Sequence, residues 1–507
     1  MKFKRLATLA IIPLLLGTLA SCGDPSTTAT TEDTTKTDQT TKDDTSVVTT
    51  ESFIDTPTEI TIWTTMGQDK QPWLEQMITE FKKIEPNVTI NHEVQSGNYE
   101  ALKTLITNGL AGNNYPNMTY CYPDHVASYF SSKKVVNLTP YVENEQYGLT
   151  DEDLSDIYAG YWEEGKNYNG PESGAIYSLP FAKSSELMYY NADKLLNQTI
   201  PGVNDGRALT EAYFNNLTWD EFFDVFCPAL VSYNETLPEN EKLFNYKDSK
   251  FGILGYDSAA NLFITLLKQY DIPYTEAGTN VNTGEILWNN DEAKALTKKF
   301  AEYAEKKYIV VPQAVDEDYT SNLFVAQNCL FTVSSTAGIS HIAGQGVNIG
   351  CAVIPQADLS NKAVISQGPS FCVLNRGNEN ENLACWLFYK YITSSKNNIT
   401  WSMGSGYFPI RDSSYNSREF QSYYHLDDLG YFTDKSALDY GQAITYSKSE
   451  EIGSYAYTSP VFRNSSASRN AVDGLMVQIL TDGRNSGAAA VDYDTLFTEA
   501  YNNAING

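Results

Sequence analysis

The stretch "TEITIWTTMGQDKQPWLEQMITEFKKIEPNVTINHEV", residues 58–94, determines the fold class expected for the main part of this chain. Residues 58–65 alternate between apolar and polar side chains and are rich in β-branched residues, which predicts a strand. In residues 70–86 apolar side chains recur every three or four positions, which predicts a helix ending before Pro86: Trp73, Met77, Phe81 and Ile84. Residues 87–94 alternate again and predict a second strand.

The same alternation of strand and helix continues to residue 122. Asn98 is a candidate cap for a helix that Gly112 ends, and its expected buried face consists of Leu102, Leu105 and Ile106. Residues 117–122 form the third predicted strand. This β-α-β-α-β order favours a parallel sheet covered by helices. Ligands bind at the carboxyl ends of such strands, so Asp124, just after the third strand, is well placed.

The first residues of the chain predict a secretory signal, residues 1–21. A basic start is followed by an apolar run from Leu6 to Ala20, which is too short to span a bilayer comfortably. Leu19 to Cys22 resembles the lipobox of bacterial lipoproteins. Under that resemblance Cys22 becomes the first mature residue and carries acyl chains, which hold a protein on a membrane. The alternative is an ordinary cleaved signal with an incidental cysteine.

Residues 22–57 are rich in Thr and contain almost no apolar side chains. Such a stretch buries too little surface to offset its ordering entropy, so we expect a disordered tether. A random coil of about 35 residues reaches roughly 30–35 Å. The sequence thus predicts a folded body held away from a membrane surface by a lipid anchor, on the extracellular face of the cell membrane.

The composition limits the function classes. The chain has 507 residues, and 63 acidic against 35 basic side chains give a formal charge of −28, which disfavours nucleic-acid binding. The part after residue 57 is too long for one ordinary core, so we expect two lobes. No CxxC pair occurs among the six cysteines after Cys22, and buried free thiols are favoured over disulfides.

Known catalytic motifs are weak or missing. Ser402–Gly406 resembles a nucleophile elbow in the wrong register, and Gly344–Gly350 is more typical of a surface turn than of a nucleotide site. The four histidines, at positions 92, 125, 341 and 425, form no metal-binding pattern, so no metal or cofactor is expected. The 63 acidic residues offer too many carboxylate pairs for the sequence to decide about glycoside cleavage.

Several segments together resemble the extracellular solute-binding proteins of bacterial ABC importers, in the class for sugars and glycerol-3-phosphate. They occur in the family's order and include "EFKKIEPNVTI", "GNYEALK", "LPFAKSSELMYYN", "QGPSFCVLN" and "MGSGYFPIR". The resemblance implies an α/β fold of two lobes, like periplasmic binding proteins, joined by hinge strands and closing over a ligand. The implied first lobe is 58–183 plus 337–392, and the second is 184–336 plus 393–507. Crossings are expected near Lys183–Glu186, Val333–Thr336 and Tyr391–Ser394.

The resemblance also implies ligand-binding positions in the cleft between the lobes. These are Tyr99, Asp124, Ser184, Tyr256, Ser335, Gly368, Tyr407 and Arg469. Tyrosine rings stack on the apolar face of a sugar, and a carboxylate accepts bonds from its hydroxyls. Other interpretations stay open, because a strand-end tyrosine is often a core residue and the serines can bond the hinge backbone. Where the glycerol-3-phosphate branch has two tryptophans, this chain has Tyr256 and Ala259.

The expected function is that of a lipid-anchored receptor that is not an enzyme. It binds a mono- or oligosaccharide and delivers it to the transmembrane subunits of an ABC permease, and a monomer is expected. One alternative is a receptor for glycerol-3-phosphate or a glycerophosphodiester. An alternative from another class is a cell-surface glycan hydrolase. The sequence determines neither the sugar nor its length.

Overall fold

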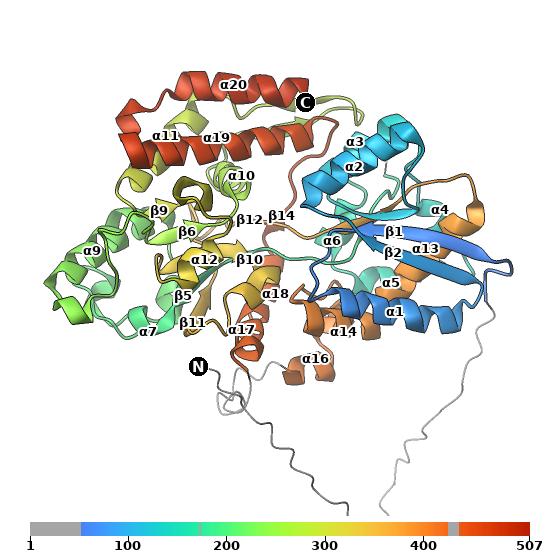
Figure 1. Ribbon diagram of the computed structural model, residues 1–507, viewed down its shortest axis with the longest axis horizontal. Coiled ribbons are helices and arrows are strands. Elements are labelled where there is room, and N and C mark those ends of the chain that lie inside the picture. Colours follow the sequence, from blue (N-terminus) through green and yellow to red (C-terminus); the bar gives the residue numbers. More distant parts are fainter. Residues whose placement is uncertain (1–51, 171, 173, 424–435) are drawn as a thin grey trace, which may run out of the picture. The chain divides into compact units, whose positions relative to one another are not determined.

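The computed structural model describes residues 52–170, 172, 174–423 and 436–507 (Figure 1). The predicted signal segment, Cys22, most of the predicted tether and His425 lie outside the described residues. Two five-stranded sheets organise the described part.

The first sheet contains the strands predicted at the start of the chain. Its order is β2 (Val88–Val94), β1 (Thr58–Thr64), β3 (Met118–Cys121), β13 (Ser370–Val373) and β4 (Leu179–Pro180). β1 pairs in parallel with both β2 and β3, which confirms the predicted β-α-β-α-β unit. β13 is antiparallel to β3 and to β4.

Helices of the first half of the chain, together with α13, accompany this sheet. They are α1 (Gln71–Ile84), α2 (Tyr99–Gly112), α3 (Pro123–Tyr129), α4 (Thr139–Val142), α5 (Asp151–Asp156), α6 (Ala159–Glu164) and α13 (Glu379–Ile392). Asn98 caps α2 as predicted, because its side chain accepts a hydrogen bond from the Ala101 amide at 3.0 Å.

Two residues predicted on buried helix faces are exposed. Ile84 is 41% exposed because it is the last residue of α1. Leu105 is 39% exposed because it lies to one side of the stripe formed by Leu102 and Ile106.

The second sheet has the order β11 (Ile349–Ala352), β5 (Glu186–Asn191), β10 (Phe331–Ser335), β6 (Leu254–Tyr256) and β9 (Ile309–Val310). β5 is antiparallel to β10 and β11, whereas β6 is parallel to β10 and β9. Two small sheets pair β12 (Val364–Ile365) with β14 (Ala456–Tyr457), and β7 (Thr275–Ala277) with β8 (Gly284–Ile286).

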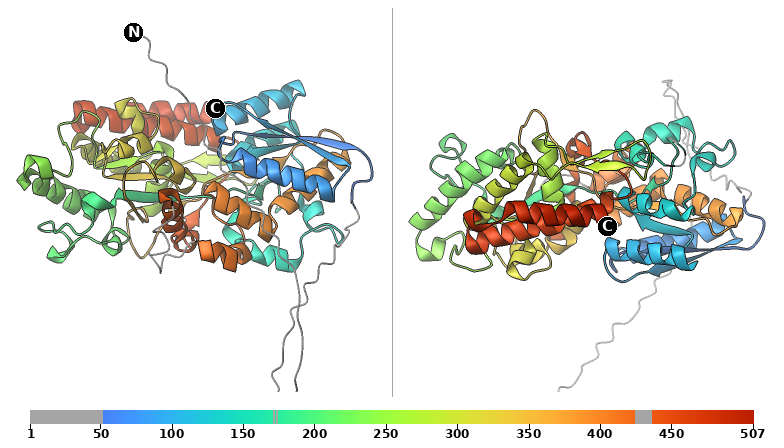
Figure 2. Two further views of the ribbon diagram at one scale, coloured as in Figure 1. Left: turned by 60° about the horizontal axis from the view of Figure 1, so that its bottom comes forward. Right: turned by 90° about the horizontal axis from the view of Figure 1, so that it is seen from above.

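The helices around the second sheet come from the middle and the end of the chain. They are α7 (Ala192–Leu195), α8 (Glu211–Phe214), α9 (Cys227–Thr236), α10 (Ala259–Gln269), α11 (Asp291–Glu305), α12 (Thr320–Val325), α17 (Ala437–Tyr446), α18 (Ser449–Gly453), α19 (Ser465–Ser486) and α20 (Tyr493–Asn506). A π-helix, Glu221–Phe226, leads into α9. The helices α19 and α20 lie side by side over α10 and α11 (Figures 1 and 2).

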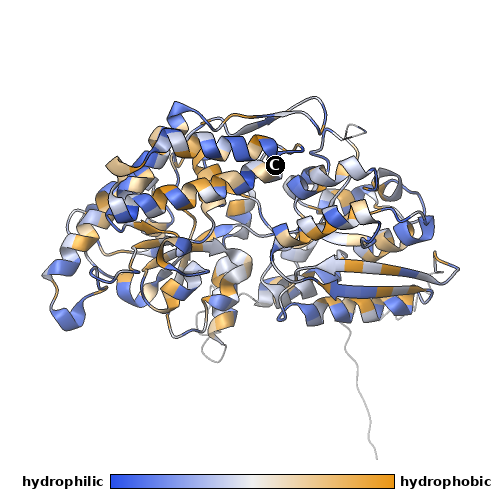
Figure 3. Ribbon diagram, turned by 45° about the horizontal axis from the view of Figure 1, so that its top comes forward, coloured by the Kyte–Doolittle hydropathy of each residue, from blue (hydrophilic) through white to orange (hydrophobic). Residues whose placement is uncertain are grey.

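Each sheet has its own hydrophobic core. Buried side chains of the first include Ile60, Ile62, Leu74 and Phe81, and those of the second include Leu187, Phe263 and Phe331. Apolar residues accordingly concentrate on the strands and on the inward faces of the helices (Figure 3). Trp386 and Trp401, predicted as core residues, are buried in the first core.

The chain passes from one sheet to the other more than once. It leaves the first sheet after β4 and enters the second at β5, and it returns to the first sheet between β12 and β13. β10, which contains most of the crossing expected at Val333–Thr336, and the next strand, β11, both belong to the second sheet. The helices α14 (Ser395–Ser405), α15 (Asp412–Tyr415) and α16 (Arg418–Tyr423) follow α13. The residue ranges of the two lobes stay a prediction.

Within the described residues, no helix combines the length and the apolar character needed to cross a bilayer. The six cysteines of the described part are buried free thiols, as the sequence predicted.

Candidate functional site

Residues 183–184 lead from the first sheet to the second, residue 367 leads back to the first, and residues 407–408, between α14 and α15, bridge to residue 183. We call residues 183–184, 367 and 407–408 the crossing layer. The Ser184 amide donates to the Gln367 carbonyl at 3.0 Å, and the Phe408 amide donates to the Lys183 carbonyl at 2.7 Å. Successive side chains of extended backbone point to opposite faces. The layer therefore has two faces, each with its own set of side chains.

Contacts of the side chains identify the two faces. Ser184 and Ser335 lie together, with 3.4 Å between their Oγ atoms, whereas Lys183 Nζ lies 2.5 Å from Glu164 on the other face. Tyr407 and Phe408 divide in the same way, because they line different cavities. We call the side with Ser184 and Tyr407 the cleft face, and the side with Lys183 and Phe408 the rear face.

A cavity of about 860 Å³ lies on the cleft face, and we call it the cleft cavity. Its walls come from the loop after β1, the start of α2, α12, and the carboxyl ends of β6 and β10. It brings together three predicted site residues: Tyr99, Ser335 and Tyr407. The hydroxyls of Tyr99 and Tyr407 are 3.4 Å apart, and the Tyr407 ring stacks on Trp401 at 6.0 Å with an interplanar angle of 10°.

Three more hydroxyls at this cavity have no hydrogen-bond partner among the described residues. They belong to Thr65, Tyr120 and Ser334, which the sequence analysis did not single out. Each hydroxyl is buried, so leaving it without a hydrogen-bond partner costs free energy unless a ligand supplies that partner. Thr65 and Tyr120 lie at or just after the carboxyl ends of β1 and β3, so the strand-end rule that selected Asp124 could also have found them.

The acidic group of the cleft cavity is Asp257, which follows β6. Its carboxylate accepts hydrogen bonds from the Thr320 amide at 2.8 Å and from the Thr320 hydroxyl at 3.2 Å. Burial raises the pKa of Asp257, and the two bonds from Thr320 oppose that rise. Lys70, also at this cavity, is paired with Asp69 at 2.8 Å. Rings, hydroxyls and one carboxylate thus surround a space that can hold a polar ligand rich in donors and acceptors.

Two other predicted residues, Asp124 and Arg469, line a smaller cavity of about 60 Å³. Tyr122 lines it as well, and its ring meets that of Tyr99 edge-on at 4.9 Å. The tyrosine pair therefore stands between the two cavities. The Arg469 guanidinium hydrogen-bonds the Asn261 side-chain carbonyl.

Ser184 and Gly368 belong to the crossing layer and its margin. Ser184 is 3% exposed and has its backbone bonded to Gln367. The Gly368 carbonyl accepts a hydrogen bond from Lys183 Nζ at 3.2 Å. The bond between Ser184 and Gln367 joins their backbones, and the Ser184 hydroxyl lies 3.4 Å from that of Ser335, so the ligand-binding role of both residues stays a prediction.

The structure does not bring Tyr256 to the cleft cavity. Its side chain is fully buried in the second core, and its hydroxyl donates to Glu186 at 2.6 Å. A ring enclosed on all sides has no free face for stacking on a ligand, so the proposed stacking role does not fit this arrangement. The reason is its position: Tyr256 is the last residue of β6, a strand with neighbours on both sides in the sheet.

The histidines and the serine segment considered as metal or catalytic sites have structural roles instead. His92 lies 2.7 Å from both Thr64 and Glu75, and His125 lies 3.0 Å from Glu100. Among the described residues no group of three His, Cys, Asp or Glu side chains is arranged to hold a metal ion. Ser402–Gly406 runs through the end of α14, which differs from the strand-turn-helix of a nucleophile elbow.

Comparisons with known proteins agree with this architecture. The sn-glycerol-3-phosphate-binding periplasmic protein UgpB of Salmonella typhimurium is 21% identical over 373 residues, covering 72% of this chain and 77% of that protein. UgpB from Mycobacterium tuberculosis in complex with glycerophosphocholine has a TM-score of 0.63 and 16% identity, covering 88% of this chain and 98% of the other. An ABC substrate-binding protein from Listeria monocytogenes in complex with cycloalternan has a TM-score of 0.63 and 15% identity, covering 89% and 98%.

These structural similarities confirm the predicted α/β fold of two lobes, like periplasmic binding proteins. A family model described as "Bacterial extracellular solute-binding protein" matches residues 76–427, which is more than half of the chain. This chain therefore belongs to the bacterial extracellular solute-binding protein family.

Proposed function

We propose that this protein is the lipid-anchored receptor of an ABC importer, that it binds a carbohydrate in the cleft cavity and that it passes the sugar unchanged to the permease. The observation that carries the proposal is the set of unpartnered hydroxyls of Thr65, Tyr120 and Ser334 beside the rings of Tyr99 and Tyr407. A sugar presents hydroxyls that both donate and accept, and an apolar face that stacks on a tyrosine ring.

The size of the cleft cavity fits this class of ligand. Small-molecule sites occupy about 300–1,000 Å³, and the cavity measures about 860 Å³. Its carboxylate, Asp257, and its tyrosines favour a neutral polyol over an anion. The single cation at its wall, Lys70, already has Asp69 as a partner.

The second candidate is glycerol-3-phosphate or a glycerophosphodiester. Arg469 beside the small cavity favours it, as does the similarity to a protein named for glycerol-3-phosphate binding. Asp124 at the same cavity repels a phosphate, and the cavity holds about 60 Å³ in this arrangement. A carbohydrate is therefore the first choice.

The anchor is proposed from the lipobox resemblance around Cys22 and the Thr-rich residues after it. A protein held by acyl chains stays in the membrane fraction, so Cys22→Ser should release it into the medium. Metabolic labelling with an alkyne fatty acid should mark the wild type and not this variant. Release of the wild type without label would contradict the anchor.

The test of the cleft cavity compares variants that lose a hydroxyl without a hydrogen-bond partner with a variant that loses a hydrogen-bonded hydroxyl. Tyr120→Phe and Ser334→Ala each remove an unpartnered hydroxyl, so they should leave the melting temperature of the free protein unchanged or raised. In Tyr389→Phe, the matched control, the lost hydroxyl donates to the Pro180 carbonyl at 2.9 Å, so the free protein should be less stable. Tyr407→Ala should weaken binding of the sugar at least about tenfold.

Calorimetry and thermal shifts with mono- and oligosaccharides and with glycerol-3-phosphate provide the measurement. A ligand at 100 times its Kd should add about 2.7 kcal/mol of stability. Sugar binding that Tyr120→Phe and Tyr407→Ala weaken supports the proposal. Binding of glycerol-3-phosphate alone would favour the second candidate, and release of a cleaved product would favour the glycan hydrolase.

A further inference from the structure

A second cavity, of about 590 Å³, lies on the rear face of the crossing layer, and we call it the rear pocket. It shares no lining residue with the cleft cavity. Phe408 forms part of its wall, whereas its neighbour Tyr407 lines the cleft cavity. The rear pocket adjoins the small cavity, because Glu164, Ser366 and Thr458 line both. The rear pocket and the cleft cavity are therefore lined by different residues, with the small cavity next to the rear pocket.

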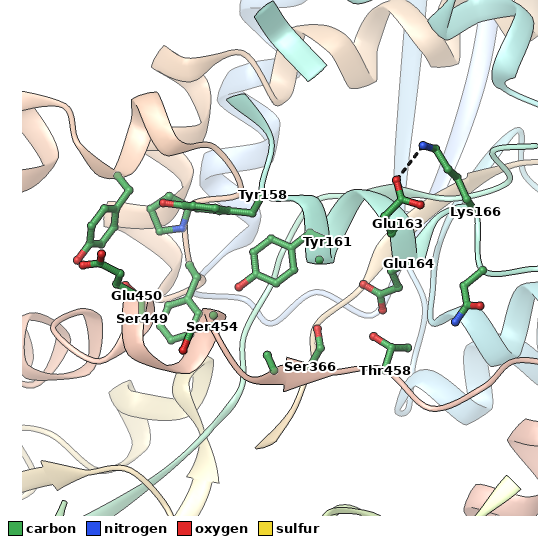
Figure 4. Close-up of a pocket in the computed structure, with 17 residues that line it drawn as sticks. Tyr158, Tyr161, Glu163, Glu164, Lys166, Ser366, Ser449, Glu450, Ser454 and Thr458 are labelled. Atoms are coloured by element: carbon green, nitrogen blue, oxygen red, sulfur yellow. Dashed lines mark hydrogen bonds and ion pairs between the residues drawn. The ribbon is translucent and has the colours of Figure 1, made fainter. Parts of the chain in front are cut away.

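Aromatic rings form one side of the rear pocket. Tyr158 and Tyr161, at the start of α6, meet edge-on with centroids 6.1 Å apart and an interplanar angle of 87°. Figure 4 shows both rings at the middle of the pocket, with Glu450 at one end and Glu163 and Glu164 at the other.

The charges around the pocket are unbalanced. Lys166, which lines it, lies 2.9 Å from Glu163, and Lys183 Nζ lies 2.5 Å from the lining residue Glu164, so both lysines are already paired. Within the described residues, no lysine or arginine lies in ion-pair distance of the Glu450 carboxylate. The pocket thus has an uncompensated negative charge beside two half-buried tyrosine rings.

Other contacts support this description. Burial raises the pKa of the Tyr158 hydroxyl, and nearby carboxylates of Asp412, Glu450 and Asp156 raise it further, which indicates a negative local potential. The Ser366 hydroxyl, at the wall, is buried and has no hydrogen-bond partner in the described part of the chain. It can accept a hydrogen bond from a ligand.

We propose that the rear pocket is a second binding site, distinct from the cleft cavity, that takes a small organic cation. The Tyr158 ring attracts a cation through its quadrupole, as the Tyr161 ring already does with Lys183 Nζ at 5.9 Å from its centroid, and the Glu450 carboxylate supplies the opposite charge. An anion is repelled by the same groups. The proposal goes beyond the transport of a sugar and does not depend on it.

Choline is the probe, and the neutral comparison is its carbon isostere, in which carbon replaces the nitrogen. Calorimetry on the full chain should show choline binding in the millimolar range or tighter, and binding of the isostere at least about fivefold weaker. Equal binding of the two compounds, or no binding of choline, would overturn the proposal.

Two neighbouring glutamates provide a matched pair of variants. Glu450→Gln removes the free carboxylate and should weaken choline binding about fivefold. Glu451→Gln changes the next residue, whose carboxylate accepts from Lys362 at 3.0 Å and does not line the pocket, so choline affinity should stay within about twofold. Equal effects of both variants would show a general charge effect and overturn the site.

The cleft variant separates this proposal from the proposed function. Tyr407→Ala lies on the other face of the crossing layer, so it should weaken sugar binding and leave choline binding within about twofold. Loss of choline binding in this variant would place choline in the cleft and overturn the rear pocket as its site. Sugar binding without choline binding would retain the proposed function alone.

Discussion

At the scale of single residues, Glu186 connects the second sheet to the crossing layer. It is 1% exposed at the start of β5 and accepts hydrogen bonds from Tyr256 at 2.6 Å, Asn261 at 2.7 Å and Gln367 at 3.4 Å. Burial raises the pKa of Glu186 to about 7, although these bonds and the nearby Arg469 oppose the rise. The carboxyl group therefore changes charge near neutral pH.

This pKa predicts a specific dependence of stability on pH. The folded pKa of about 7 lies above the ordinary value of 4.5 for a glutamate, so the folded state binds the proton more tightly. The contribution of Glu186 to the free energy of unfolding is full below about pH 4.5 and falls as pH rises to about 7, by up to about 1.4 kcal/mol per pH unit. In Glu186→Gln this dependence should vanish.

The measurement is denaturant unfolding of both proteins from pH 5 to pH 8. The free energy of unfolding of the wild type, minus that of Glu186→Gln, should decrease as pH rises. Other titrating groups cancel in this difference because they are common to both proteins. A difference that stays constant with pH would contradict the raised pKa.

At the scale of elements, the crossing layer depends on a close approach of two backbones. Gly368 has a φ of +90°, and a Cβ atom there would lie 1.9 Å from the Ala182 carbonyl oxygen. Ala182 belongs to the segment that leads from β4 to β5, and Gly368 belongs to the segment that leads from β12 to β13. A shift of either backbone would therefore displace the other segment. Glycine at this position is thus required by both conformation and space.

Gly368→Ala should therefore destabilise the protein more than a matched substitution. Gly377 also has a positive φ, +95°, but open space surrounds its missing Cβ, so Gly377→Ala tests the conformational strain alone. We expect a loss of about 1 kcal/mol for Gly377→Ala and at least about twice that for Gly368→Ala. Thermal unfolding followed by circular dichroism measures both, and equal losses would contradict the steric argument.

The elements themselves were largely predictable from the sequence. The strands at residues 58–65, 87–94 and 117–122 and the cap at Asn98 were found because local alternation and capping act over a few residues. The exposure of Ile84 and Leu105 was not predicted. It depends on how far along and around each helix the neighbouring elements cover it, and periodicity alone does not give that.

At the scale of the whole described part, polar contacts join α2, beside the first sheet, to α19, beside the second. The Ser466 hydroxyl lies within hydrogen-bond distance of Lys103 Nζ and donates to the Glu100 carboxylate at 3.1 Å. Ser466 is 1% exposed, so its hydroxyl is shielded from water at this junction. These contacts hold the two lobes together without touching the cleft cavity.

Ser466→Ala should favour a more open arrangement of the lobes. The loss of two polar contacts should increase the radius of gyration of the free protein and weaken binding of a cleft ligand about threefold to tenfold, without any direct contact to it. Small-angle scattering and calorimetry measure the two effects. Thr498→Ala on α20, whose exposed hydroxyl bonds the Asp494 carbonyl, is the control and should change neither. Unchanged scattering and affinity in Ser466→Ala would contradict a role of Ser466 in closure.

The sequence by itself determined the α/β class, the order of the first strands, the buried thiols and the family resemblance, because each depends on local periodicity or on short segments. Only the tertiary structure decided which predicted residues share a cavity. It grouped Tyr99, Ser335 and Tyr407, buried Tyr256, and placed Lys183 and Ser184 on opposite faces. It also revealed the unpartnered hydroxyls of the cleft cavity and the rear pocket. The reason is physical: a cavity consists of side chains from segments far apart in the chain, and local patterns do not specify their distances.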